Sequence, residues 1–373
     1  MILLAIDKFK GSATSVQIAL AAERGLHAVL PDLEVVTMPI ADGGDGTLAA
    51  LAQALPDAQW KQCSVTPPVG GTGPTAVAKY LVTPDGTAVM ELAAASGIAL
   101  APHLDALHAQ TIGTGDMIAH AIGQGCRHIV LGIGGSASTD CGTGLLSRLG
   151  FKFLNKDGHT LPPCGASLAS IASIDASHVP QAVRDTRFTL MSDVDNPLCG
   201  PQGSAAVFAP QKGADSAMVA LLEQGTQHFA TLLPEGIASK PGAGAAGGVG
   251  AGMMGLLGAQ IKPGALTVLH LLHFDEVAAR ATLIVTGEGR IDASSAHGKA
   301  PAAVLQAGQA LGVPVVALCG QATPEAHNLG FFKVIDITPA GMPLSQAMRT
   351  DVTLTNVQRA AFHLASTLKH IKN

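Results

Sequence analysis

Apolar segments that alternate with longer helix-like segments occupy both ends of the chain. Residues 2–6 are an uninterrupted apolar run, typical of a strand buried on both faces, and residues 14–30 have the Ala- and Leu-rich pattern of a helix. A second strand at 33–38 and a second helix at 46–55 repeat the pair. This alternation predicts an α/β fold with a parallel sheet.

The C-terminal part continues the same pattern. It predicts strands at 282–286, 313–318 and 334–337, with a helix at 299–311 between the first two. Together with the two N-terminal strands, these segments are enough for a small five-stranded doubly wound sheet.

The middle of the chain has a different character. Between residues 58 and 91, Pro- and Gly-rich turns such as Pro67-Pro68 and Pro84-Asp85-Gly86 separate short Val, Thr and Ala runs, which predicts an antiparallel meander. Further strands are expected at 128–133 and 187–191. We therefore expect two domains: residues 1–59 with 281–373, and an inserted α/β domain of residues 60–280.

Composition limits the partners of the protein. Charged residues make up 13 % of the chain, where about 25 % is ordinary, and the net charge is −5. This balance argues against a nucleic-acid or anionic-membrane surface. Any anion is therefore expected to bind at a local site, and the 44 glycines are candidates for building it.

The cysteines and the N-terminus indicate a cytoplasmic protein. The six cysteines are scattered without a CxxC pair, and the first six residues are too short an apolar run for a signal peptide. The longest charge-free run, 300–324, is interrupted by Gln, Gly and Pro, so we expect helix, turn and strand there and no membrane span.

A first candidate site follows the second predicted strand. Asp42-Gly43-Gly44-Asp45-Gly46-Thr47 lies between that strand and the next helix, where backbone amides can bind an anion. Because two carboxylates would repel a bare phosphate, a cation or a hydroxyl group is expected between them. The alternative is a tight turn with an Asp helix cap.

Residues 134–144 form the second candidate site. Glycines there let a phosphate approach the backbone, and the hydroxyl groups and one carboxylate suit nucleotide phosphates with Mg²⁺. The segment 286–292 also leaves a predicted strand, with Lys299 opening the next helix. It is either a phosphate-binding loop or a solvated, salt-bridged loop.

Acidic and basic residues mark three further places. Asp193 and Asp195 follow the strand at 187–191, where a carboxylate can act as general base or metal ligand, and Lys212 lies in the segment 208–214. Asp7, Lys8 and Lys10 close the first strand at the same predicted edge. The lysines are either partners of an anion or ordinary surface charges.

Familiar nucleotide motifs are missing. There is no GxxxxGK[ST] sequence, and residues 242–247 match GxGxxG only formally, because they follow a Lys-Pro loop instead of a strand. A dinucleotide-binding site is therefore not expected. Residues 242–258 are expected to form a glycine-rich loop that enters a closely packed helix.

In their order along the chain, these segments resemble the bacterial type-1 glycerate kinase family. The matching segments are 41–47, Gly132-Ile133-Gly134-Gly135-Ser136-Ala137, Asp193 with Asn196-Pro197-Leu198, Pro210-Gln211-Lys212-Gly213-Ala214, 241–248, and 286–292 with Gly298-Lys299. The resemblance covers essentially the whole chain. It implies one flavodoxin-like domain and one inserted mixed-sheet domain that resembles restriction endonucleases, with the active site in the cleft between them.

The resemblance also implies ATP-dependent phosphorylation of D-glycerate with Mg²⁺, and a 2-phosphoglycerate product. The alternatives are a 3-phosphoglycerate product, another small hydroxy acid as substrate, or a small-anion binding module without turnover. The sequence does not separate a monomer from a homodimer.

Phosphoryl transfer needs positioning, neutralised charge and a carboxylate that accepts the hydroxyl proton. We expect Asp193 to be that base and the glycerate to bind near Lys8, Lys10, Asp7 and Asn196. The expected catalytic or metal-binding residues are Asp42, Asp45, Asp193, Asp195, Lys212 and Arg290. The expected nucleotide-binding residues are Gly134, Gly135, Ser136, Ser138, Thr139, Asp140, Gly287, Glu288, Gly289 and Lys299.

Overall fold

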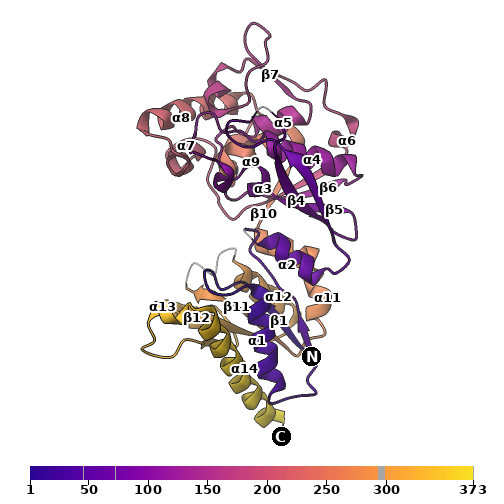
Figure 1. Ribbon diagram of the computed structural model, residues 1–373, viewed down its shortest axis with the longest axis vertical. Coiled ribbons are helices and arrows are strands. Elements are labelled where there is room, and N and C mark those ends of the chain that lie inside the picture. The colour runs from indigo at the N-terminus through magenta and orange to yellow at the C-terminus, as the bar shows by residue number, and fades with distance from the viewer. Residues whose placement is uncertain (45, 72, 293–298, 373) are drawn as a thin grey trace. The chain divides into compact units, whose positions relative to one another are not determined.

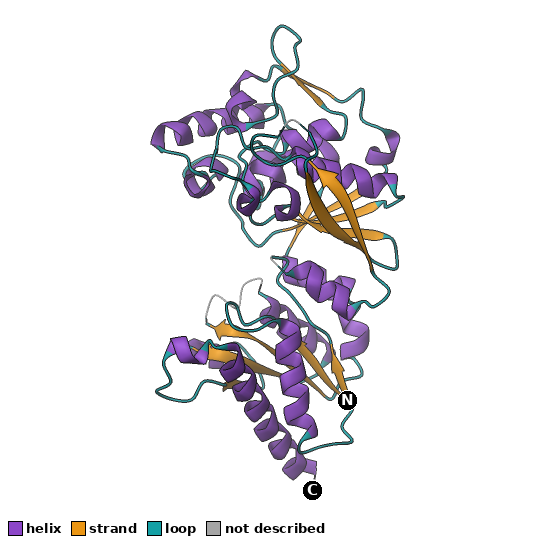
Figure 2. Cartoon of the chain, viewed as in Figure 1, coloured by secondary structure: helices purple, strands orange, loops and turns teal. Residues whose placement is uncertain are grey.

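The computed structural model describes residues 1–44, 46–71, 73–292 and 299–372. It divides into two compact units, unit 1 (Met1–Pro56 and Pro263–Asn373) and unit 2 (Asp57–Lys262). Figure 1 labels their elements and Figure 2 shows both units as mixtures of helices and strands. The expected mixed α/β class is confirmed.

Unit 1 holds a five-stranded, all-parallel sheet in the order β13-β12-β11-β1-β2. Its strands are β1 (Ile2–Ile6), β2 (Val35–Thr37), β11 (Leu283–Ile291), β12 (Val315–Ala322) and β13 (Lys333–Asp336). Its helices are α1 (Ser15–His27), α2 (Thr47–Ala54), α10 (Gly264–Leu271), α11 (Phe274–Ala278), α12 (Ala300–Leu311), α13 (Leu344–Ala347) and α14 (Thr350–Lys372). This is the flavodoxin-like strand order.

Helices cover both faces of this sheet, as the apolar strands require. Side chains of α1 and α14 pack with Ile2, Leu4 and Ile6 in one core cluster, whereas α12 approaches Ile284 from the other face. Strands buried on both faces are near-continuous apolar runs. The pattern of residues 2–6 is explained in this way.

Unit 2 is built on a mixed six-stranded sheet in the order β10-β9-β6-β5-β4-β3. The strands of unit 2 are β3 (Gln59–Val65), β4 (Ala76–Val82), β5 (Thr87–Glu91), β6 (His128–Gly132), β9 (Arg187–Met191) and β10 (Gln260–Lys262), with the separate pair β7 (Lys152–Leu154) and β8 (Ser173–Asp175). Its helices are α3 (Ala93–Ser96), α4 (Ile112–Gly123), α5 (Thr143–Arg148), α6 (Gln181–Arg184), α7 (Ser204–Phe208), α8 (Ser216–Thr231) and α9 (Ala245–Leu257). In the six-stranded sheet β3, β4 and β5 pair antiparallel, as the meander predicted, and the other pairs are parallel. The separate pair β7 and β8 is antiparallel.

Two segments differ from the pattern expected from the sequence. The strand expected to end at residue 286 continues as β11 to Ile291, so Gly287 and Glu288 lie within a strand and not in a loop. Here the glycines serve strand pairing: a Cβ on Gly287 would lie 2.1 Å from the Leu318 carbonyl oxygen. Residues 263–280 belong to unit 1, because α10 and α11 pack on α12.

The glycine-rich segment 242–258 follows its prediction. It enters α9, where Ala246, Gly247 and Gly248 adopt positive φ angles and interrupt the regular helix. A Cβ on Gly247 would lie 2.0 Å from the carbonyl oxygen of Ser138. Glycine is therefore needed at this position for close packing against the 134–144 segment.

Candidate active site

The sheet of unit 1 has a topological switch point between β1 and β11. From β1 the chain continues to β2 on one side, and from β11 it continues to β12 on the other. Asp7 follows β1 directly, and its backbone N–H donates to the carbonyl of Gly287 over 3.0 Å. Open α/β sheets bind their ligands at such a point, outside the carboxyl ends of the strands.

A cavity of about 480 Å³ lies at this place, within unit 1. Many of the residues singled out in the sequence line it: Asp7, Lys8, Lys10, Asp42, Glu288, Gly289, Arg290 and Lys299. Gly287 is not among its lining residues, and Asp45 lies outside the described residues. The fold thus brings segments from both ends of the chain to one cavity.

Asp7 has a strongly perturbed carboxyl group in this cavity. Burial, and then the negative charges of Asp42 and Glu288, raise its pKa to about 7, although the backbone N–H and the charge of Lys8 act in the opposite direction. The Lys8 N–H donates to Asp7 Oδ1 over 2.6 Å. A carboxyl group with such a pKa can accept and release a proton near neutral pH.

Cations face these carboxylates. Lys299 Nζ lies 3.9 Å from Glu288 Oε2, and Arg290 Nε lies 3.3 Å from Asp292 Oδ2. Lys8 and Lys10 line the same cavity. The cavity therefore offers both positive groups that can bind a carboxylate or phosphate and acidic groups that can accept a proton.

The cavity also contains residues that the sequence analysis missed. Ser12, Gln321 and Thr338 line it, at the end of β12 or in the loops that follow β1 and β13. The rule that ligands bind at the carboxyl ends of parallel strands could have identified Thr338, because the strand predicted at 334–337 ends directly before it. Gln321 lies beyond the end of the strand predicted at 313–318, because β12 continues to Ala322. Ser12 carries no such signal.

The second set of predicted residues lies in unit 2, after β6. Gly134 and Gly135 are exposed, whereas Ser136, Ser138, Thr139 and Asp140 are buried. The Asp140 carboxylate accepts hydrogen bonds from Thr111 Oγ1 (2.7 Å), from Ser138 Oγ (3.0 Å) and from the backbone N–H groups of Thr111, Gly142 and Gly144. Burial raises its pKa, and these hydrogen bonds act against that rise. Asp140 therefore organises the loop from inside.

Lys212 is also buried, with only 2 % of its surface exposed. Its Nζ donates to Ser136 Oγ over 2.8 Å and to the carbonyl oxygen of Ser138. Burial lowers its pKa to about 8, against the opposing charge of Asp140. The ammonium group is thus directed at the loop itself.

The third predicted group follows β9. Asp193 and Asp195 are exposed. The side-chain Nδ2 of Asn196 donates to the backbone carbonyl of Gln202 over 2.8 Å, and the backbone carbonyl of Asn196 accepts from the Gly244 N–H. Asn196 therefore holds the following turn against the start of α9. That the residues of the two units serve one active site stays a prediction.

The donor types fit a magnesium ion that arrives with a nucleotide. In the described ranges, no three Asp, Glu, His or Cys side chains come close enough to hold a metal ion by themselves. Mg²⁺ in phosphoryl-transfer enzymes needs only one or two protein carboxylates, because phosphates and water complete its shell. Asp42, Asp193 and Asp195 are the carboxylates predicted for this role.

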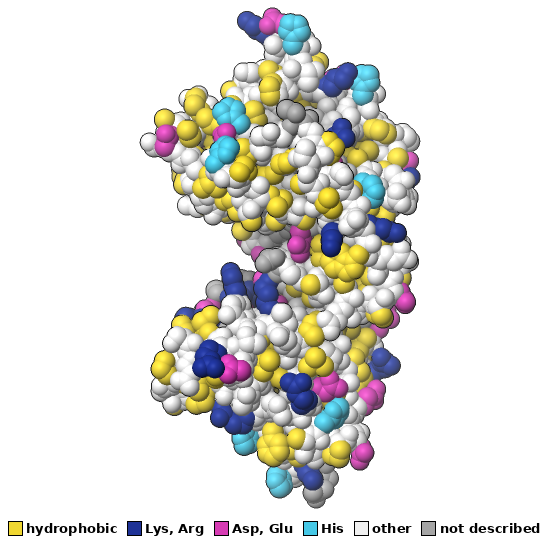
Figure 3. Space-filling model, in the orientation of Figure 1, with side chains coloured by type: hydrophobic (Ala, Val, Ile, Leu, Met, Phe, Trp, Pro, Cys, Tyr) yellow, Lys and Arg dark blue, Asp and Glu magenta, His cyan; other side chains and the backbone are white. Residues whose placement is uncertain are grey.

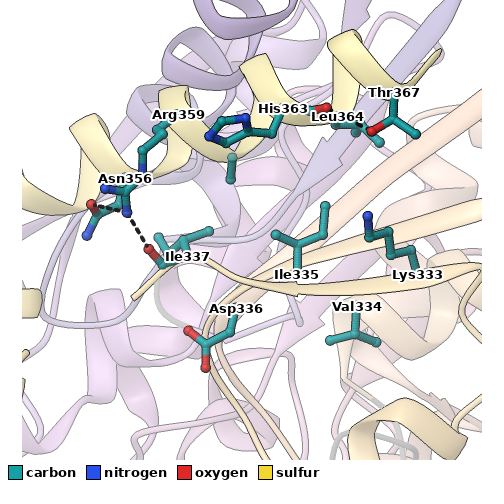
Figure 4. A pocket seen from close by; sticks show the side chains of 11 residues that line it. Lys333, Val334, Ile335, Asp336, Ile337, Asn356, Arg359, His363, Leu364 and Thr367 are labelled. Carbon is teal, nitrogen blue, oxygen red and sulfur yellow. Dashed lines mark hydrogen bonds between the residues drawn. The ribbon is translucent and has the colours of Figure 1, made fainter. Parts of the chain in front are cut away.

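A second cavity, of about 230 Å³, lies between β13 and α14 (Figure 4). Lys333, Arg359 and His363 line it, and Arg359 Nη2 donates to Asn356 Oδ1 over 3.0 Å. None of the predicted site residues lines this cavity. It is therefore not the candidate active site.

The surface agrees with the low charge of the sequence. On the face drawn in Figure 3, charged side chains are sparse between large hydrophobic and uncharged areas. The helices in the described part of the chain are all too short or too polar to cross a membrane.

Comparison with known proteins identifies relatives over the full length. A family model described as the glycerate kinase family matches residues 2–369. A glycerate kinase of Bacillus cereus is 37 % identical over 99 % of this chain and 98 % of its own length. A protein of Escherichia coli named glycerate 2-kinase is 36 % identical over 98 % of this chain and 97 % of its own.

A solved structure is similar over the whole chain. The crystal structure of a putative glycerate kinase 2 from Salmonella typhimurium matches with a TM-score of 0.89 and 34 % identity, covering 100 % of this chain and 98 % of the other. The fold described above is therefore shared by a relative whose sequence differs at most positions.

Proposed function

Because the chain belongs to the glycerate kinase family, and is therefore a kinase, we propose that it transfers the γ-phosphoryl group of ATP to the 2-hydroxyl of D-glycerate. The 2-position is supported by the name of the Escherichia coli relative. A cytoplasmic location fits its six free cysteines.

One observation carries the proposal most directly: the cavity at the switch point of unit 1 combines cations with carboxylates. Lys8, Lys10 and Arg290 supply positive charge for the carboxylate of glycerate. Arg is suited to this task because its planar group can bind a carboxylate through two hydrogen bonds.

In unit 2, the backbone N–H groups of the exposed Gly134 and Gly135, with the hydroxyl of Ser136, would bind the triphosphate. Bound Mg²⁺, held by Asp42, Asp193 or Asp195, would neutralise phosphate charge. Lys299 lies beside Glu288 in the cavity of unit 1 and is a further cation for the phosphates.

The reaction forms one bond and breaks one. The glycerate hydroxyl oxygen bonds to the γ-phosphorus, the bond to the leaving ADP oxygen breaks, and a carboxylate accepts the hydroxyl proton. Asp193 is our predicted proton acceptor, on the pattern of an acid after a strand. Asp7 competes for this role, since its pKa lies near 7.

Replacing each carboxylate by an amide shows which of the two residues accepts the proton. If Asp193 accepts the proton, Asp193→Asn lowers kcat by about 10²–10⁴-fold, the usual contribution of a general base, and ATP still binds. Asp157→Asn, at an exposed aspartate of unit 2 outside the predicted site, is the matched control. Near-normal turnover of Asp193→Asn together with a large loss in Asp7→Asn would transfer the role to Asp7.

The overall activity is tested by coupled measurement of ADP release with D-glycerate and ATP. Release above the ATP-only blank is expected, and its absence would contradict the proposal. Phosphorus NMR of the product separates 2-phosphoglycerate from 3-phosphoglycerate. Other small hydroxy acids in the same assay measure substrate selectivity.

A further inference from the structure

Lys212 is an unusual cation, because its ammonium group is almost completely removed from water. It ends the short 3-10 turn Pro210–Lys212, and Gly213 follows with a φ of 93°. A buried charge is costly unless it is paired and hydrogen-bonded. The partners of Lys212 should therefore reveal what this charge is retained for.

Those partners all belong to the segment that follows β6. Lys212 Nζ donates to Ser136 Oγ over 2.8 Å and to the Ser138 carbonyl, while the Ser138 hydroxyl donates to Asp140. Asp140 is fully buried, and its charge favours the protonated form of Lys212. The lysine and the aspartate thus hold the same loop from two sides.

The hydrogen bond to Ser136 has a directional consequence. A serine hydroxyl has one hydrogen to donate and two lone pairs that accept, whereas a lysine ammonium can only donate. Ser136 Oγ must therefore accept from Lys212, and its own hydrogen cannot point back toward the lysine. Ser136 directly follows the exposed Gly134 and Gly135, so this hydrogen remains for a ligand at those glycines.

We propose that Lys212 is a positioning residue that does not touch the nucleotide, and that it makes Ser136 a hydrogen-bond donor to the phosphates bound at Gly134 and Gly135. The inference rests on the proposed function, because it takes ATP as the ligand of this loop. It replaces the expectation from the sequence that Lys212 is itself a catalytic residue.

The ionisation of Lys212 gives the proposal a signature. Burial lowers the pKa of Lys212 to about 8, while the negative charge of Asp140 acts in the opposite direction. Burial also raises the pKa of Cys141 well above its usual value, so this thiol stays protonated. Above pH 8 the neutral amine gains a lone pair, and Ser136 can then donate to Lys212 instead of to the phosphate.

The experiment measures ATP binding by titration calorimetry with excess Mg²⁺ and without D-glycerate. The wild-type chain and Ser136→Ala are compared from pH 6.5 to 9.5. At pH 7 we expect Ser136→Ala to bind ATP about tenfold more weakly, as for loss of one hydrogen bond to a charged group. Towards pH 9.5 the wild-type affinity should fall to that of Ser136→Ala.

Ser170→Ala serves as the matched control, because Ser170 is an exposed serine elsewhere in unit 2. It should follow the wild-type pH profile. A constant affinity ratio between wild type and Ser136→Ala across the pH range would overturn the proposal.

A double-mutant cycle tests the same coupling through Lys212. Lys212→Met should weaken ATP binding about tenfold in the wild-type background and by less than twofold in Ser136→Ala. Additive losses would show that Lys212 acts on the nucleotide independently of Ser136. If Lys212→Met does not fold, the pH comparison decides, since it needs only wild type and Ser136→Ala.

The binding measurement also separates this inference from the proposed function. A chain that binds ATP with the expected pH dependence but releases no ADP with D-glycerate contradicts the proposed reaction alone. A chain that turns over D-glycerate with a constant ratio of affinities contradicts the role of Lys212 alone.

Discussion

Individual residues of this protein have properties that depend on how deeply they are buried. Asp7, 6 % exposed, and Lys212, 2 % exposed, have pKa values displaced toward neutrality from opposite sides. Burial disfavours the charged form of each group, so it raises the pKa of the acid and lowers that of the base. Both groups can therefore change protonation within the physiological range.

For Asp7 this shift predicts a stability effect with a definite sign. The folded chain keeps a proton on Asp7 up to about pH 7, whereas the unfolded chain releases it near pH 4. Asp7 thus lowers the free energy of unfolding as pH rises between these values, by up to about 4 kcal/mol. Asp7→Asn should therefore be more stable than wild type at pH 8 and equally stable at pH 4.

Urea unfolding at pH 4, 6 and 8 without divalent cations measures this difference. Asp32→Asn, an exposed aspartate of unit 1, should show no such pH-dependent gain. If wild type and Asp7→Asn have the same free energy of unfolding at all three pH values, Asp7 is ionised in the folded state without a loss of stability.

At the scale of elements, glycines fix how closely helices and strands approach. Gly25 of α1 faces α14, where an added Cβ would lie 2.2 Å from the Gln358 carbonyl oxygen. Gly123, the last residue of α4, has open space at the same position. Close packing therefore requires a glycine at position 25, whereas the space around Gly123 would accept a larger side chain.

Substituting each glycine by alanine should change stability in opposite directions. Gly25→Ala forces α1 and α14 apart and should cost about 1–3 kcal/mol, although alanine favours helix formation. Gly123→Ala should be neutral or stabilise by up to about 1 kcal/mol. Thermal unfolding of both variants measures this difference. Equal unfolding midpoints for Gly25→Ala and Gly123→Ala would show that close packing of α1 on α14 does not require glycine.

Local pattern predicted most elements, and it failed where pairing with a distant segment decided the outcome. The strand that begins near residue 283 runs to Ile291 because β12 pairs with it as far as Ala322. The sequence of 287–291 contains two glycines and two charges and resembles a loop. A register set by a neighbouring strand cannot be detected within one segment.

At the scale of the whole molecule, charge is scarce and partly concentrated in one place. The chain has 22 Lys and Arg residues, and Lys8, Lys10, Arg290 and Lys299 line the cavity of unit 1. A local group of positive charges attracts an anionic substrate without making the rest of the surface basic.

Removing one of these cations should therefore weaken glycerate binding selectively. Lys8→Met should raise the KM for D-glycerate about tenfold or more, the scale of a lost charged hydrogen bond, and leave the KM for ATP within twofold. Lys333→Met, in the separate cavity of Figure 4, is the control. Steady-state kinetics with each substrate varied in turn measures both KM values. A larger change in the KM for ATP than in the KM for D-glycerate would contradict this prediction.

The sequence by itself determined the alternation of strands and helices at both ends of the chain, the change of character in the middle, and several of the residues that line the cavity of unit 1. These features are local, because apolar periodicity, glycine-rich turns and acidic residues after strands can each be recognised within a short segment of sequence. Only the tertiary structure decided that Asp7 is buried beside two other acids and that Lys212 is directed at Ser136. Burial and charge pairing arise from residues distant in sequence, so no single segment contains them.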